Sequence, residues 1–202
     1  MLELTQRTAA TGAAGGNSAR TQDRMQRLTS TWRGRLSIVN LRLDPSDAAA
    51  TAAVAEVLGL ALPLAPCTAC GDERLRIVWA GPDDWFLIGP AGQAEGWIAR
   101  LSAVLQGRHH ALTDVSSGFR VLQLGGPSAR ELLAQGCPLD LHPRVFQPGM
   151  SAGTVFFKAS VWLWQTDTAS LTSPHYELLV RSSFQGYVQL LVEQCRSACG
   201  VA

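Results

Sequence analysis

An internal repeat constrains the fold of this chain more than any other feature. A unit of strand, turn, strand and helix is predicted at 74–106 and again at 161–198. Gly-Trp-Ile at 96–98 and Gly-Tyr-Val at 186–188 fall at equivalent positions of the two predicted helices. A further strand and helix precede each unit. The repeat predicts an α+β fold, a duplicated split βαβ with antiparallel or mixed sheets and about four helices. Strands mixed with so few helices disfavour a doubly wound parallel sheet.

Apolar periodicity and turn residues place the individual elements. Strands are predicted at 36–43, 74–80, 85–88, 110–115, 119–124, 154–157, 161–164 and 176–180. Helices are predicted at 48–58, 93–106, 127–136 and about 183–198, the third of them with Pro127 at its first position. A proline-containing loop is expected at 60–71 and a second one at 137–149.

The N-terminal segment differs in composition from the rest. Residues 1–33 are rich in Ala, Thr, Gly, Ser and Arg and show no apolar periodicity. We therefore expect a flexible basic arm at 1–33, or an arm that orders on a partner. The remainder, 34–202, is expected to form one domain made of two similar lobes, about 34–116 and 117–202.

Composition limits the classes of function. The formal net charge of +1 excludes a strongly charged protein, and the basic arm lacks the runs of adjacent charge and interleaved aromatics typical of nucleic-acid binding. No apolar run is long enough to span a bilayer. Five cysteines cannot form a complete disulfide framework, and no signal-peptide core follows Met1, so we expect a cytoplasmic protein with reduced thiols.

The low content of charge suggests a protein that hides surface against a partner. Charged residues make up 16% of the chain, against about 25% in ordinary soluble domains. Six tryptophans point the same way, because large aromatics are enriched at interfaces. An alanine-rich composition that dilutes every other residue type is the alternative explanation, and the sequence leaves both open.

The candidate chemical motifs are weak. Cys67 and Cys70 have the spacing of redox or zinc sites, but the pair that would complete a zinc site, Cys195 and Cys199, lies on the apolar stripe of the last helix. The adjacent histidines at 109–110 would point apart in an extended chain. We therefore expect core and loop cysteines and no metal site.

Three further motifs carry no specific signal. Asp83 and Asp84 follow Gly-Pro and are expected to be solvated turn residues. The Gly-Gly-Pro-Ser stretch at 125–128 lacks the additional glycines and the lysine of a phosphate-binding loop. The serines at 116–117 have no cue for a paired base. The residues alone therefore predict no catalytic, cofactor-binding or metal-binding site.

Four segments resemble a known family. They are Trp79-Ala-Gly-Pro-Asp-Asp-Trp-Phe-Leu-Ile88, Thr113-Asp-Val-Ser-Ser-Gly-Phe-Arg-Val121, the stretch from Leu124 to Phe146, and Tyr176-Glu-Leu-Leu-Val-Arg-Ser-Ser-Phe184. Together they resemble the gamma subunit of bacterial heterotetrameric sarcosine oxidase, over about residues 35–198. The stretch 126–146 is the most specific part.

The resemblance implies a fold and an assembly. The fold would be the folate-binding-domain fold, similar to the glycine-cleavage T protein, which is itself a duplication. The partners would be the alpha subunit above all, with beta and delta in the complex. The holoenzyme demethylates sarcosine to glycine with oxygen, releases hydrogen peroxide and transfers the one-carbon unit to tetrahydrofolate. FAD, FMN, NAD and zinc would belong to the other subunits, and this chain would hold no cofactor.

The resemblance also implies a subunit of an oxidoreductase without an active site of its own. The T protein carries a catalytic acid shortly after the strand that corresponds to 176–180, and residues 181–186 here contain no Asp or Glu. A stand-alone folate-binding or aminomethyltransferase-like protein remains the alternative. Six residues are candidate partner contacts, with local core or loop structure as the other explanation: Trp79, Trp85, Arg130, His142, Arg144 and Phe146.

Overall fold

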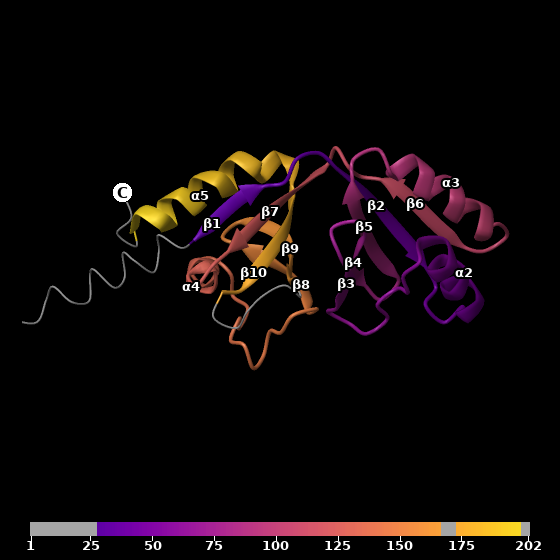
Figure 1. Ribbon diagram of the computed structural model, residues 1–202, viewed down its shortest axis with the longest axis horizontal. Coiled ribbons are helices and arrows are strands. Elements are labelled where there is room, and N and C mark those ends of the chain that lie inside the picture. Colours follow the sequence, from indigo (N-terminus) through magenta and orange to yellow (C-terminus); the bar gives the residue numbers. More distant parts are fainter. Residues whose placement is uncertain (1–27, 167–172, 199–202) are drawn as a thin grey trace, which may run out of the picture.

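Two five-stranded antiparallel sheets face each other, and helices cover their outer faces (Figure 1). The structure is a computed structural model that describes residues 28–166 and 173–198. The first sheet has the order β3 (Ala69–Gly71), β4 (Arg76–Gly81), β5 (Asp84–Pro90), β2 (Leu36–Leu43), β6 (His110–Asp114). The second has the order β8 (Ser151–Phe156), β9 (Ala159–Gln165), β10 (His175–Arg181), β7 (Phe119–Gly125), β1 (Thr29–Trp32).

The helices divide between the two sheets as the repeat predicts. Helices α2 (Ala48–Leu58) and α3 (Ala94–Val104) pack on the first sheet. Helices α4 (Ala129–Ala134) and α5 (Gln185–Ala198), the latter after a short 3₁₀ turn at Ser182–Phe184, pack on the second. With four α-helices in the described part of the chain and two antiparallel sheets, the predicted α+β class is confirmed.

The strand order shows how the duplication is completed. In each lobe the second strand of the hairpin, β5 or β10, lies beside the strand that opened the lobe, β2 or β7. Beyond β2 lies β6, which follows helix α3 in the chain. Beyond β7 the same position is held by β1, which comes from the N-terminal side of the chain. The chain therefore passes from one sheet to the other twice, between β1 and β2 and between β6 and β7.

Strand β1 corrects the predicted end of the N-terminal arm. Thr29 pairs with Gly125 and Trp32 with Leu122, and Leu28 is buried. The segment is held by backbone pairing and by contacts with α5, where Trp32 Nε1 donates to Gln189 Oε1 at 2.6 Å. This four-residue strand, Thr-Ser-Thr-Trp, is too short to show apolar periodicity, so its sequence gives no strand signal. The rest of the predicted arm, 1–27, lies outside the described residues.

Two smaller boundaries also differ from prediction. The loop expected at 60–71 ends in strand β3, a three-residue edge strand whose register follows from pairing with β4. Its neighbourhood also touches the second sheet, because Ser151 N donates to the Cys67 carbonyl and Ala69 N to the Gly149 carbonyl, both at 2.8 Å. Helix α4 begins after Pro127 rather than at it.

Three apolar clusters make up the core. One lies between each sheet and its helices, and the third lies between the two sheets. In the third, the Phe86 ring meets Phe119 and Trp162 edge to face, with centroid distances of 5.5 and 4.9 Å. The two lobes therefore share apolar core across their interface, which fixes the position of one sheet relative to the other.

Candidate functional site

A loop projects from the second lobe between α4 and β8 (Figure 1, orange). We call residues 138–148 the projecting loop. Leu141 and Phe146, each only 4% exposed, anchor it in the core of that lobe. Between them the chain turns tightly, with Val145 N donating to the His142 carbonyl at 2.8 Å and Arg144 N to His142 Nδ1 at 3.2 Å. His142, Arg144 and Val145 are thereby held in place on the surface, and Val145 is 51% exposed.

The structure separates the six predicted contact residues into exposed and buried ones. His142 and Arg144 lie together on the projecting loop. Arg130 is half-buried on α4, where its Nε donates to the Tyr176 hydroxyl at 3.2 Å, and Trp79 is half-buried in the other lobe.

Two of the predicted contacts are corrected. Trp85 lies on the central strand β5 with no exposed surface, and its Nε1 donates to the Pro63 carbonyl at 2.9 Å. Phe146 is the anchor beneath the projecting loop. A partner that docks on the surface reaches neither ring, so both residues leave the set of candidate contacts and stabilise the fold instead.

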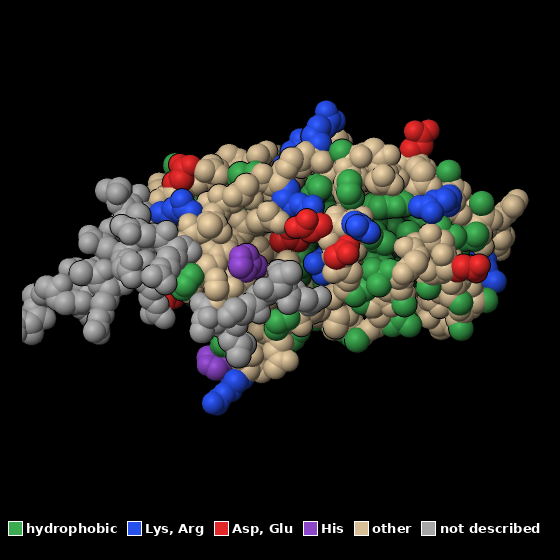
Figure 2. All heavy atoms as spheres, in the orientation of Figure 1, with side chains coloured by type: hydrophobic (Ala, Val, Ile, Leu, Met, Phe, Trp, Pro, Cys, Tyr) green, Lys and Arg blue, Asp and Glu red, His purple; other side chains and the backbone are tan. Residues whose placement is uncertain are grey.

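A second exposed region is strongly apolar. Between residues 48 and 71 the only charged side chain is Glu56. The loop after α2 covers Trp85, and its Leu64 is 52% exposed. Figure 2 shows hydrophobic side chains gathered over the lobe that carries α2 and β3–β6, whereas charged side chains lie mainly around them. This apolar surface is of the kind that protein partners cover.

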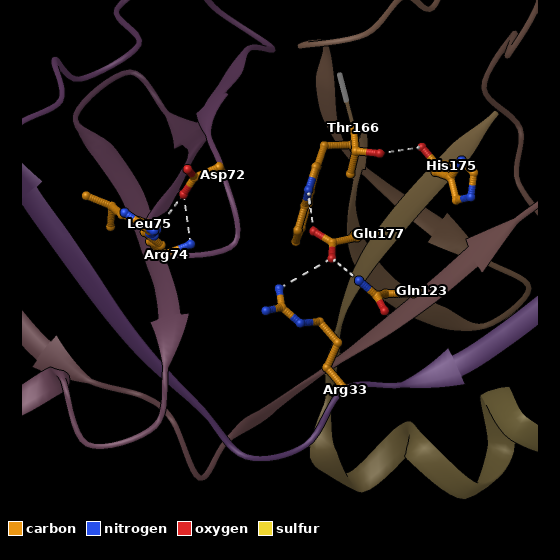
Figure 3. Close-up of polar contacts among 9 residues, drawn as sticks. Arg33, Asp72, Arg74, Leu75, Gln123, Thr166, His175 and Glu177 are labelled. Carbon is orange, nitrogen blue, oxygen red and sulfur yellow. Dashed lines mark hydrogen bonds and ion pairs between the residues drawn. The ribbon is translucent and has the colours of Figure 1, made fainter. Parts of the chain in front are cut away.

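A polar pocket of about 290 Å³ lies between the two sheets. Figure 3 shows its two walls, with the turn around Asp72 on one side and Glu177, Gln123 and Arg33 on the other. Glu177 is buried on the central strand β10, at 4% exposure. Its Oε1 accepts from Gln123 Nε2 at 2.8 Å and from Arg33 Nη1 at 3.4 Å, and its Oε2 accepts from Trp164 Nε1 at 2.9 Å.

These contacts decide what Glu177 can do. A buried carboxylate is tolerated when donors satisfy both oxygens and a cation pairs with it. Glu177 has three donors from the chain itself, one of them the Arg33 guanidinium. Its carboxylate is therefore committed to holding β1, β7, β9 and β10 together, and it is not free to act as a base.

Two buried charges of the pocket, Glu177 and Arg76 on the opposite wall, were not predicted from the sequence. Arg76 lies on β4, is 6% exposed and lines the same pocket. Each lies in a strand whose other residues are mostly apolar. That pattern is the signal that could have found them, because a charge in a core strand needs a partner.

The remaining sequence motifs are ordinary parts of the fold. Cys67 is exposed, Cys70 lies in β3 with its Sγ 3.5 Å from the Ala61 carbonyl, and Cys195 is buried; Cys199 lies outside the described residues. Among residues 28–166 and 173–198 no group of three or more His, Cys, Asp or Glu could hold a metal ion.

The expectation for Asp84 is corrected. Asp83 is a surface residue that pairs with Arg42 at 2.7 Å. Asp84, in contrast, is partly buried at the start of β5, and Asn40 Nδ2 donates to its Oδ1 at 2.5 Å. Burial raises the pKa of the Asp84 carboxyl, and the Asn40 hydrogen bond only partly opposes this effect.

Two facing sheets with outer helices and a duplicated strand order define the class to which this protein belongs. The aminomethyltransferase T of the glycine cleavage system from Bartonella henselae has this fold, with a TM-score of 0.58 at 13% identity over 85% of this chain and 48% of that one. The folate-binding-domain-like fold predicted from the sequence is thereby confirmed, and this likeness establishes the fold alone.

Family membership follows from a closer set of matches. The family model described as sarcosine oxidase, gamma subunit family matches residues 42–198. The chain belongs to this family. It is 36% identical to the sarcosine oxidase subunit gamma of an Arthrobacter species over 133 residues, or 65% of this chain and 64% of the relative. It is 37% identical to that of Corynebacterium sp. strain P-1 over 134 residues, or 66% and 63%.

A solved structure agrees with the family. A chain of the heterotetrameric sarcosine oxidase from Corynebacterium sp. U-96 has a TM-score of 0.78 at 26% identity, covering 92% of this chain and 93% of that one. The sequence match itself spans less than two thirds of the length of the curated relatives. Within the described residues, no helix has both the length and the apolar character needed to cross a membrane.

Proposed function

We propose that this protein is the gamma subunit of a bacterial heterotetrameric sarcosine oxidase, packed on the alpha subunit in a cytoplasmic complex with beta and delta. The observation that carries the proposal is the structural likeness to a chain of such an oxidase over nearly the full length of both chains. The complex would demethylate sarcosine to glycine with oxygen, release hydrogen peroxide and pass the one-carbon unit to tetrahydrofolate. FAD, FMN, NAD and zinc would be held by the other subunits.

The chain's own role in this proposal is structural. Glu177 is saturated by donors of the same chain, and the turn after β10 carries no acid. The Ser182 backbone in that turn donates to the Gly118 carbonyl at 2.9 Å, which closes the end of the strand against the neighbouring turn. Both observations support a subunit that stabilises an assembly and does no chemistry itself.

The projecting loop is the proposed contact with the large subunit. A partner gains most from a segment whose backbone is already ordered, because ordering it on binding costs free energy. The loop provides this, since Leu141 and Phe146 hold its ends and exposed Arg144 and Val145 lie between them. Trp79 and Arg130, half-buried on other elements, would lie at secondary contacts.

Co-purification tests the proposal. The tagged chain is expressed with the other oxidase subunits of its host, and subunit masses and flavin absorbance are read together after affinity purification. We expect a yellow complex that contains much larger chains. A colourless lone chain from cells grown on sarcosine would overturn the subunit function.

The contact surface has its own test in the same experiment. The double variant Arg144→Ala, Val145→Asp should reduce the yield of complex about tenfold, or 1.4 kcal/mol of binding free energy, while the chain stays folded by circular dichroism. Val104→Asp is the matched control, because Val104 is an exposed valine (41%) on α3 of the first lobe, whereas the projecting loop belongs to the second lobe. Equal yields from both variants would show that the projecting loop is not the contact.

A further inference from the structure

Arg76 is a buried cation without a partner among the residues that the structure describes. It projects from β4 into the space between the sheets, and its Nε and Nη1 are shielded from solvent and have no hydrogen-bond partner. None of the described residues forms an ion pair with it. A guanidinium carries five donors and stays charged in proteins. A buried charge in this state is strongly destabilising unless something else pairs with it.

The acidic residues around the pocket are already engaged or turned to solvent. Both oxygens of Glu177 accept hydrogen bonds from the second lobe and β1. Asp72 Oδ1 accepts from the backbone N–H groups of Arg74 at 2.8 Å and Leu75 at 3.4 Å, which shape the turn before β4 (Figure 3). These bonds are the main reason why the pKa of Asp72 is lowered. The charge of Arg76 also lowers it, but it is the smallest of the causes. Within residues 28–166 and 173–198, no side chain therefore supplies a direct counter-ion for Arg76.

We infer that the pocket between the sheets binds a small free carboxylate, which pairs with Arg76. Because Nε and Nη1 are enclosed, Nη2 is the guanidinium nitrogen open to the pocket, and it would donate to one carboxylate oxygen. The Thr31 hydroxyl also lines the pocket and would donate to the second oxygen, whereas the Thr29 hydroxyl already donates to the Gly125 carbonyl at 3.2 Å. The volume of about 290 Å³ suits a compact ligand.

The charges of the pocket also select the class of anion. Asp72, Glu73 and Glu177 line it together with Arg33 and Arg76, so the wall holds more acidic than basic groups. A doubly charged phosphate or sulfate would be repelled by these acids, whereas a monoanion needs only the one unpaired guanidinium. A monocarboxylate is therefore expected and inorganic phosphate is not. The inference does not depend on the subunit function.

Titration of the full-length chain with acetate tests the site. Thermal unfolding is followed at constant ionic strength while acetate replaces chloride, because a ligand that binds only the folded state raises the melting temperature in a saturable way. We expect a saturable rise with acetate and none when phosphate replaces chloride. Arg76→Gln should abolish the rise. The control is Arg74→Gln, because Arg74 is an exposed arginine two residues before Arg76. This variant should show the same rise in melting temperature as the wild type.

The comparison of acetate, chloride and phosphate on the wild-type chain tests the site by itself, so it can be made even if Arg76→Gln does not fold. A melting temperature that responds equally to acetate and chloride would overturn the site. The site would also be overturned if acetate stabilised Arg76→Gln as much as the wild type, or if phosphate stabilised the wild type as strongly as acetate.

Discussion

At the scale of single residues, the surroundings of a buried charge show whether it only stabilises the fold or could also bind a ligand. Glu177 and Arg76 face the same pocket from opposite sheets, but their surroundings differ. Glu177 is surrounded by donors, whereas Nε and Nη1 of Arg76 have no acceptor among the described residues. The first is therefore part of the scaffold, and only the second has binding capacity left.

The role of Glu177 leads to a stability prediction. Glu177→Gln keeps the shape but removes the charge that pairs with Arg33 and accepts from Trp164. We expect a loss of about 2–4 kcal/mol in the free energy of unfolding, measured by urea denaturation. Glu73→Gln, on the exposed rim of the same pocket, should change it by less than about 0.5 kcal/mol. Similar losses in both variants would contradict the scaffold role.

Asp84 gives a prediction for pH. Its pKa is raised in the folded state, so folding favours its protonated form, and its contribution to stability is lost as pH rises from the unfolded pKa through the raised one. Asp84→Asn cannot ionise and still accepts from Asn40. The variant should therefore gain stability over the wild type at pH 7 and show no gain near pH 3, about one unit below the unfolded pKa.

Urea denaturation of both chains at each pH is the measurement. Asp44, Asp47 and Asp72 have lowered pKa values and the opposite pH dependence, but they are present in both chains and cancel in the difference. If the difference in stability between the two chains did not vary with pH, ionisation of Asp84 would not be its cause.

At the scale of elements, helix α3 depends on a side chain from another element. Gln93 at its N-cap makes no side-chain capping bond. Ser37, buried on β2, takes over this role, because its Oγ accepts from Gln93 N at 2.8 Å and Ala94 N at 3.1 Å. The start of α3 is thus tied to the start of β2 in the first sheet.

Loss of this cap should be measurable. Ser37→Ala removes the acceptor, so the backbone N–H groups of Gln93 and Ala94 lose this hydrogen bond. We expect a loss of about 1–2 kcal/mol in the free energy of unfolding. The control is Ser160→Ala in β9, whose side chain is exposed. If the two variants had equal stability, the capping role would be contradicted.

The sequence predicted elements with strong periodicity and missed those defined by pairing. The strand at 36–43, the helix at 48–58 and the duplication itself are confirmed, because their apolar patterns repeat locally. Strands β1 and β3 exist because a neighbouring strand offers backbone groups to pair with. The partner of β1 is β7, far along the chain, so no local pattern could indicate it.

At the scale of the whole molecule, the shared core between the sheets should make the two lobes unfold together. Phe86 of the first lobe contacts Phe119 and Trp162 of the second and is 5% exposed. Phe86→Ala should cost about 3–5 kcal/mol. Leu190→Ala, on the exposed face of α5 (53%), should cost far less.

The number of unfolding transitions tests directly whether the two lobes unfold together. Tryptophan fluorescence and circular dichroism should give coincident urea transitions in the wild type, since one core stabilises both lobes. Two separated transitions in the wild-type chain would show that the lobes fold independently and that the contact between the sheets contributes little.

The candidate site was predicted less well than the fold. His142 and Arg144 are found together on an exposed turn, but Trp85 and Phe146, chosen as aromatic anchors, are core residues. An aromatic residue has the same sequence signature whether a partner or the protein's own core buries it. The pocket joins residues from β1, β4, β7 and β10, so only the folded arrangement brings it together.

Strand β1 comes before the first lobe in the chain but belongs to the sheet of the second lobe. The architecture therefore does not require the chain to start where it does. In the first lobe the chain runs from α3 directly into the outer strand β6, whereas in the second the outer strand β1 is joined to β2. The end of α5 already lies against the start of β1, where Arg196 Nη2 donates to the Leu28 carbonyl at 2.8 Å. A circularly permuted chain, joined from α5 to β1 and opened between β1 and β2, would keep every strand pairing. The same native structure would then be encoded as two consecutive, complete copies of one unit.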